Sequence, residues 1–321
     1  MFKKYWLRYL ILLAAIGIVL SFILRLLTPS PTIISKTDFI TTNKSGDSTK
    51  FSKITYVGSP YTEVPEKLSL LTIQPNSTSL EYVKNTIIEQ YDLEQIINLP
   101  NLWQGTNFSL SYNENDDEYV FSSNYASPTQ IVASLPQAIN TSQQFIAKIF
   151  PNVQFSVLDE QVKYFGGSFQ VNEVKPKEAN IVEIPFAYSF DNIPVYLNHK
   201  SGSALRIMVN GLYEIQKVIF QPDILLLIPT EKTIGIISVE TALENINNHN
   251  EASVVSAFEI NTGIFTLEEV REGTLTSVSL EYRADLKTGF AYPFYRFVGE
   301  LINQTGQVIQ AEIITPAVPT K

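Results

Sequence analysis

The sequence predicts an α+β protein, in which an N-terminal transmembrane helix precedes tandem α-β-β-β units with antiparallel sheets. Three observations lead to this prediction. One long apolar run lies near the N-terminus, amphipathic helical patterns recur three times after it, and segments of alternating polarity with turn residues between them follow each pattern. Helices that each cover one face of an antiparallel sheet are the simplest arrangement for this order.

The apolar run extends from Tyr9 to Leu24 and is bracketed by Arg8 and Arg25. A helix of this length spans about 24 Å, and two further leucines extend it toward the hydrocarbon thickness of about 30 Å. The residues from Arg25 to Pro29 make a poor signal-peptidase site, and the chain has no cysteine for a lipid anchor. We therefore expect an uncleaved signal-anchor.

Charge gives this anchor an orientation. Lys3, Lys4 and Arg8 precede the run and no acidic residue does, which favours a cytoplasmic N-terminus in the plasma membrane and an extracytoplasmic region from about Thr28. Residues 1–28 hold four Lys/Arg, so 19 basic and 32 acidic residues remain outside, a net charge of −13. An exterior this acidic argues against nucleic acid or anionic lipid as a partner.

Composition and periodicity divide the chain into five parts. A stretch rich in Thr, Ser and Pro follows the anchor and is expected to be a flexible tether. The predicted parts are a cytoplasmic tail with the signal-anchor (1–28), a linker (29–52), an N-terminal extracytoplasmic α+β region (53–135), a first α-β-β-β unit (136–230) and a second one (231–321).

The N-terminal extracytoplasmic region begins with a predicted helix. Thr78 and Glu81 have the spacing of a capping box, and the apolar pattern after them ends near Tyr91. Alternating residues at 107–112 and 118–122, separated by a polar turn, predict a hairpin.

The first unit starts with a helix from Asn140, which Thr141 and Gln144 can cap and Pro151 stops. Strands are predicted to follow this helix at 161–171, 181–190, 195–197, 205–209 and 212–220.

The second unit starts with a helix capped by Ser238. A looser insertion is expected at 247–273, and Gly289 and Gly306 mark hairpin loops between the last strands. These strands are predicted at 275–285, 292–301 and 308–314.

No residues are expected to be catalytic, to bind a cofactor or to bind a metal, and the chain is predicted not to be an enzyme. Its two histidines, His199 and His249, lie in predicted loops, and no HExxH, GxSxG or Ser-x-x-Lys motif is present. The acidic turn at 113–118 lacks the glycine and glutamate of a calcium loop. Gly166 and Gly167 predict a bulge or tight turn rather than a phosphate cradle, because no helix follows them.

Alternating charges on the strand at 275–285, with Arg296 on the next strand, allow two interpretations. The first is a ladder of ion pairs on a solvated sheet face, and the second is a patch that binds a partner, together with nearby aromatic residues. The possible partner surface comprises Glu281, Arg283, Asp285, Tyr292, Tyr295 and Arg296.

The transmembrane helix carries a stripe of small residues, Ala14, Gly17 and Ser21. Small side chains at this spacing allow another membrane helix to approach closely. The stripe is therefore the predicted contact with a membrane partner.

The last part of the chain contains four informative segments, Ile236–Ile246 (IISVETALENI), Leu275–Asp285 (LTSVSLEYRAD), Tyr292–Glu300 (YPFYRFVGE) and Ile314–Ala317 (ITPA). These segments resemble the YycI/YycH-like regulatory proteins, which are built from PepSY-like α-β-β-β units, so the units 136–230 and 231–321 are expected to be PepSY-like. The segments match an ISxxxAL helix start, a Leu-x-Tyr strand and a Pro-x-aromatic-Arg strand. The chain departs from the family pattern at Tyr295, where a Trp is expected, and in its long insertion and extra N-terminal region.

The resemblance implies a single-pass membrane protein that regulates a cell-envelope sensor histidine kinase, partly through its transmembrane helix. The expected function is non-enzymatic, and the expected partner is such a membrane protein or a second copy of the chain. Two alternatives stay open at this point. One is an extracytoplasmic module that binds the cell wall or mediates adhesion, and the other is a PepSY-type inhibitor of a secreted protease.

Overall fold

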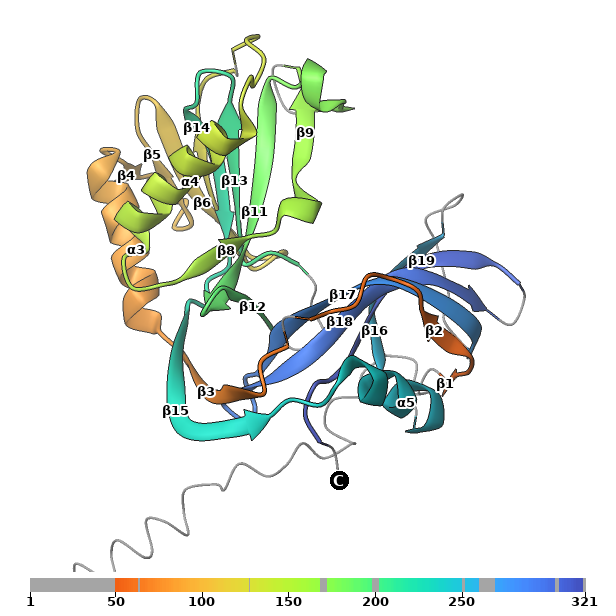
Figure 1. Cartoon of the computed structure of the whole chain (residues 1–321). Helices are drawn as coiled ribbons and strands as arrows, with labels where there is room; N and C mark the ends of the chain where they lie inside the picture. Colours follow the sequence, from red (N-terminus) through yellow and green to blue (C-terminus); the bar gives the residue numbers. More distant parts are fainter. Residues whose placement is uncertain are drawn as a thin grey trace, which may run out of the picture. The chain divides into compact units, whose positions relative to one another are not determined.

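The structure, a computed structural model, describes residues 50–319 except 63, 127, 168–171, 198–201, 250–251, 260–268 and 304–305. These residues form three α-helices, two short 3-10 helices and nineteen strands, most of them antiparallel (Figure 1). The predicted α+β class is thereby confirmed for this part of the chain. None of the described helices combines the length and the apolarity needed to cross a bilayer, and the predicted anchor at 1–28 and most of the linker lie outside the described residues.

A sheet of nine strands forms one part of the fold, and every pair in it is antiparallel. Its strands, in spatial order, are β4 (Glu94–Gln95), β5 (Leu102–Gln104), β6 (Phe108–Asn113), β7 (Glu118–Ser123), β14 (Ile215–Phe220), β13 (Leu205–Asn210), β11 (Ile181–Phe190), β9 (Lys163–Gly166) and β10 (Asn172–Glu173). The predicted hairpin at 107–122 is confirmed as β6 and β7.

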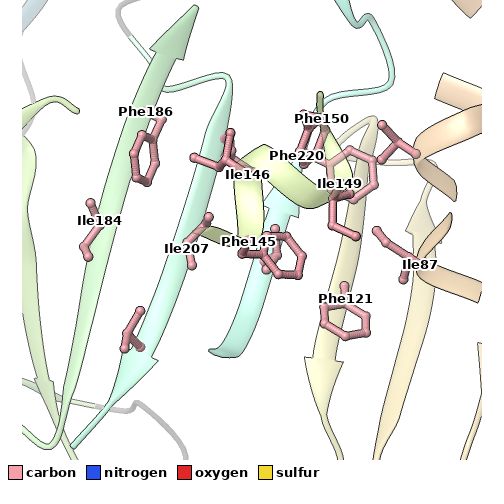
Figure 2. Packing of buried hydrophobic residues seen from close by; sticks show 14 of the residues in the cluster. Ile87, Phe121, Phe145, Ile146, Ile149, Phe150, Ile184, Phe186, Ile207 and Phe220 are labelled. Carbon is pink, nitrogen blue, oxygen red and sulfur yellow. The ribbon is translucent and has the colours of Figure 1, made fainter. Parts of the chain in front are cut away.

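Helices α3 (Ser77–Gln90) and α4 (Leu135–Ile149) pack on one face of this sheet. Phe145 and Ile149, one turn apart on α4, lie against Phe121 and Ile207 of the strands (Figure 2). Apolar residues that recur every three or four positions place one stripe of a helix on a sheet. This layer contains the largest of the three hydrophobic clusters among the described residues.

The caps of both helices differ from the prediction. Asn76 caps α3, because its Oδ1 accepts a hydrogen bond from Ser79 N at 3.1 Å, so Thr78 lies within the helix. Ser134 caps α4, and the helix therefore begins at Leu135 rather than at Asn140. Proline fits the first turn of a helix because the N–H groups there have no intrahelical acceptor, and Pro136 occupies that turn.

A second layer is formed by the C-terminal strands. The antiparallel order is β16 (Ser253–Glu259), β19 (Val308–Pro316), β18 (Phe290–Asn303) and β17 (Glu269–Asp285). Three strands pair in parallel with the other edge of β17: β1 (Lys50–Phe51), β2 (Ile54–Tyr56) and β12 (Ile193–Leu197).

Helix α5 (Val239–His249) covers one face of this layer. Ser238 caps it as predicted, since its Oγ accepts from Thr241 N at 3.2 Å. Ile246 is fully buried, whereas Leu243 is only partly buried. His249 is the last residue of the helix rather than part of a loop, and His199 lies outside the described residues.

Three predictions about strands need correction. Strand β16 lies where a loose insertion was expected, and its pairing with β19 depends on residues 50 or more positions away. The strand predicted at 161–171 is shorter, because the 3-10 helix at Asp159–Gln161 precedes β9. The segment predicted as a strand from Leu212 turns first, with Tyr213 at a positive φ of 61°, and β14 begins at Ile215.

Strand β3 (Lys67–Pro75) pairs with β15 (Leu225–Gly235) and, at two residues, with β18. These pairs join segments from three of the predicted parts of the chain. The remaining elements are β8 (Phe155–Val157), which pairs with β11, and the 3-10 helix at Pro176–Glu178. The boundaries predicted at 135/136 and 230/231 remain predictions.

Candidate functional site

A row of charged side chains crosses the C-terminal layer on the sheet face opposite α5. The register places Glu281 of β17 across from Phe294 of β18, and Leu280 across from Tyr295. Because side chains alternate along a strand, Glu281, Arg283 and Arg296 share one face. Leu280 and Tyr295 share the other face, where they join the apolar cluster that contains α5.

The row extends over four strands. Arg283 donates from Nε to Glu281 Oε1 at 2.5 Å, and Arg296 forms an ion pair with Glu281 Oε2 at 3.6 Å. Arg296 also donates to Glu312 of β19, and its Nη1 donates to the hydroxyl of Tyr196 on β12 at 2.9 Å. We call Tyr196, Glu281, Arg283, Arg296 and Glu312 the ionic row.

The ring of Tyr196 lies beside both cations. The guanidinium carbon of Arg283 is 4.8 Å from the ring centroid, and that of Arg296 is 5.2 Å from it. Cations at these distances are attracted to the negative face of an aromatic ring. Tyr196 thus contacts the two arginines in two ways, as a ring and as a hydrogen-bond acceptor.

Most of the ionic row is buried, and the side chain of Glu312 at its end is 25% exposed. The exposed fraction is 1% for Glu281, 0% for Arg283 and 8% for Arg296. The predicted ion pairs between strands are therefore present, but the face is not solvated, and an accessible partner patch is wrong for these three residues. Alternating charges on a strand normally mark a wet face, but here two carboxylates balance two guanidinium groups, and burial is tolerated because the charges are paired.

Burial shifts the ionisation of these groups. Desolvation raises the pKa of Glu281, although Arg283 and Arg296 favour its ionised form. Burial alone would lower the pKa of Arg296, but the negative charge of Glu281 and the hydrogen bond to Glu312 leave that pKa raised. Burial also raises the pKa of Tyr196. The neutral phenol of Tyr196 and the paired ions therefore connect four strands and stabilise the sheet, and they do not form a reactive centre.

The other members of the predicted partner surface lie nearby but are not part of the row. Tyr295 is buried on the α5 face, where its hydroxyl donates to Ile237 O at 2.7 Å, and burial raises its pKa to about 12. Tyr292 is 6% exposed. Asp285 is partly buried, and its Oδ1 accepts from Lys287 N in the hairpin turn that ends at Gly289. The surface is therefore not supported as predicted.

Two members of the ionic row were missed from the sequence, Tyr196 and Glu312. Tyr196 reaches the row through the parallel pair of β12 and β17, whose residues are 87 positions apart along the chain and carry no local signal. Glu312 lies on a predicted strand, and an acidic side chain in an apolar strand could have indicated a partner cation.

The residues that the structure describes contain no group of three His, Asp or Glu side chains placed to hold a metal ion. The acidic turn after β6 uses its side chains internally, because Asn113 donates to Asp116 and Tyr112 donates to Asp117 at 2.6 Å. The stripe Ala14, Gly17 and Ser21 lies outside the described residues and remains a prediction.

A comparison with solved structures finds similarity to the crystal structure of YycH from Bacillus subtilis. The match covers 76% of this chain and 52% of that chain, with a TM-score of 0.34 and 9% sequence identity. This chain thus spans about half the length of that structure, which belongs to the group of proteins that the C-terminal segments resemble. No family model and no curated protein sequence matches the chain.

Proposed function

We propose that this chain is a non-enzymatic, single-pass membrane protein whose extracytoplasmic region binds and regulates a protein partner in the membrane. The partner that we propose is a sensor histidine kinase of the cell envelope. The observation that carries the proposal is the order of features in the sequence, in which an arginine-flanked apolar run precedes a large acidic region with YycI/YycH-like segments.

The location of those segments in the fold supports a role as a binding scaffold. Ile236–Ile246 contains most of α5, and Leu275–Asp285 and Tyr292–Glu300 lie within β17 and β18. Their residues contribute to the core of the C-terminal layer and supply Glu281, Arg283 and Arg296 of the ionic row, which are held together by packing and charge pairing. A rigid sheet of this kind can present surfaces to a partner without performing chemistry itself.

The test begins with affinity capture of the full chain, with chemical cross-linking, from membranes of the source organism, followed by mass spectrometry. The captured kinase is then reconstituted in proteoliposomes, and its autophosphorylation is measured with and without the full chain. We expect the chain to change the rate.

Three results would contradict the proposal. An unchanged autophosphorylation rate would remove the kinase as the regulated partner. Retention of the chain by purified wall glycan would favour the wall-binding module, and inhibition of a secreted protease would favour the PepSY-type inhibitor.

A further inference from the structure

A groove runs between the segment that links β2 to β3 and the first turn of α5. Its volume is about 680 Å³, within the range of about 300–1,000 Å³ typical of ligand pockets. The interior is mostly apolar and is lined by Tyr56, Tyr61, Val64, Ile236, Val239 and Leu243. We propose that this groove binds a short apolar segment of a partner protein that carries Lys or Arg next to its apolar residues.

The linking segment is fixed at both of its ends. Val57 N donates to Leu275 O at 2.9 Å at one end, and Ile236 N donates to Glu66 O at 3.0 Å at the other. Pro60 and Pro65 restrict the backbone between these bonds. A groove with a wall held in this way exists before a ligand arrives, so binding does not have to order it.

The close packing of this wall supports the same conclusion. A Cβ added to Gly58 would lie 2.2 Å from Thr276 O, so only glycine allows the segment to approach β17 here. On the groove side, the ring of Tyr61 meets the edge of Tyr295 with centroids 6.4 Å apart. The groove wall therefore contacts the hydrophobic core of the C-terminal layer.

The charges at the groove indicate which kind of partner segment it can bind. Glu66 and Glu240 line the groove and are exposed, whereas none of its described lining residues is Lys or Arg. Lys67 follows Glu66 in the chain but is not among the lining residues. Two carboxylates beside an apolar interior favour a partner segment that combines apolar side chains with positive charge.

The N-terminus of α5 does not reverse this preference. The first turn of a helix has a partial positive charge that would otherwise attract an anion. Here Glu240 occupies that turn, and hydrogen bonds from its own backbone N–H and from Ser238 lower its pKa. The carboxylate is ionised at neutral pH and offsets the helix terminus.

This inference rests on the proposed function, because it names the surface that a regulated partner would contact. The probe is a fluorescent six-residue peptide, Lys-Leu-Val-Pro-Leu-Lys with blocked ends, and the control peptide has Glu in place of both Lys. Each is titrated by fluorescence anisotropy against the full chain in lipid nanodiscs. We expect the Lys peptide to bind saturably, more weakly as salt is added, and the Glu peptide not to bind.

Variants then locate the binding. The double variant Glu66→Lys/Glu240→Lys should weaken binding of the Lys peptide by about tenfold, because two attractive contacts become repulsive. The matched control is Glu94→Lys/Glu160→Lys, which makes the same charge change at two exposed glutamates that do not line the groove. The control should bind like the original chain and have unchanged thermal unfolding. The groove variant should unfold at a slightly lower temperature, because it replaces a favourable negative charge in the first turn of α5 by a positive one.

Failure of this inference can be told apart from failure of the proposed function. Absent binding of the Lys peptide, equal binding of the Glu peptide, or equal weakening by the control variant would overturn the groove. Self-association of the chain that Glu66→Lys/Glu240→Lys abolishes would identify a second copy as occupant and also overturn it. A kinase that still responds to the chain in any of these cases leaves the proposed function standing.

Discussion

Arg283 donates a hydrogen bond to Glu281, two residues away on the same face of β17, and at least 99% of each side chain is shielded from solvent. Side chains at positions i and i+2 of a strand point the same way, so this pair needs no other strand to form. Other strands add Arg296, Glu312 and Tyr196, which balance the charges and link the pair to the rest of the layer.

Replacing Arg283 by Met should destabilise the protein strongly. The change leaves the buried carboxylate of Glu281 without its closest cation, and removing one member of a buried ion pair costs about 3–5 kcal/mol in the free energy of unfolding. The measurement is urea unfolding of the full chain in detergent. Lys287→Met removes an exposed charge in the hairpin turn and should change the stability by less than about 0.5 kcal/mol.

The cost of Arg283→Met should also depend on pH. Burial raises the pKa of Glu281 above its ordinary value of 4.5. A carboxyl whose pKa is raised in the folded state contributes stability that is complete below its unfolded pKa and is lost as the pH rises through the folded pKa. Loss of Arg283 raises the folded pKa further, so the cost should be smaller near pH 5 than near pH 8. Equal costs at the two pH values would contradict this account.

Tyr295→Phe should destabilise the protein by about 1 kcal/mol. The variant keeps the buried ring but loses the hydrogen bond to Ile237 O, which connects β18 to the residues before α5. Tyr282→Phe loses a similar bond of 2.8 Å to Ser69 O and should cost about the same. The control is Tyr125→Phe, because the hydroxyl of Tyr125 bonds to Asn107 at an exposed site. A control as costly as the buried variants would mean that burial does not decide the effect.

Ser238→Ala should lower the stability by about 1 kcal/mol and raise the pKa of Glu240 toward its ordinary value. The serine caps α5 and also hydrogen-bonds to the carboxylate of Glu240, which is one cause of its lowered pKa. The pKa can be followed by NMR titration of the labelled full chain in nanodiscs. Ser59→Ala is the matched control, since Ser59 is exposed and accepts a hydrogen bond only through its backbone carbonyl in the described contacts. An unchanged pKa in Ser238→Ala would show that the backbone bond alone is responsible.

The cap of α5 could be predicted from the sequence, whereas the predicted caps of α3 and α4 were wrong. Ser238 is the one strong capping residue directly before its apolar pattern. For α4, local spacing favours Thr141, which lies inside the helix, whereas Ser134 caps it and Ala138, within the first turns, contacts the hydrophobic core. Local spacing cannot include those contacts.

The predicted strand 181–190 coincides with β11. A mostly apolar run that ends at a polar turn made both ends of the strand visible in the sequence, and nine of its residues in a row are buried. Strand β16 and the pairs β3–β15 and β12–β17 could not be predicted, since each depends on residues far away in the chain. The burial of Glu281 and Arg283 was missed for the same reason. Alternation shows that they share a face, but only the assembled strands show that this face is covered.

Gly17→Ile should weaken association with the membrane partner. The residue belongs to the predicted stripe Ala14, Gly17 and Ser21, where small side chains allow close helix contact. Isoleucine keeps the helix apolar enough to insert but fills the space that a second helix would occupy. A membrane two-hybrid assay between the full chain and the captured kinase measures the effect, and the expression of the variant should be unchanged.

Ala15→Ile provides the matched control, because residue 15 is one position from Ala14 and therefore about 100° around the helix from it. The control adds a larger side chain away from the stripe, so its association should stay normal if the stripe forms the contact. Equal association of Gly17→Ile, Ser21→Leu and the unchanged chain would mean that the helix serves only as an anchor. Recognition would then depend on the extracytoplasmic region, and the acidic groove beside α5 would be the first surface to test for kinase binding.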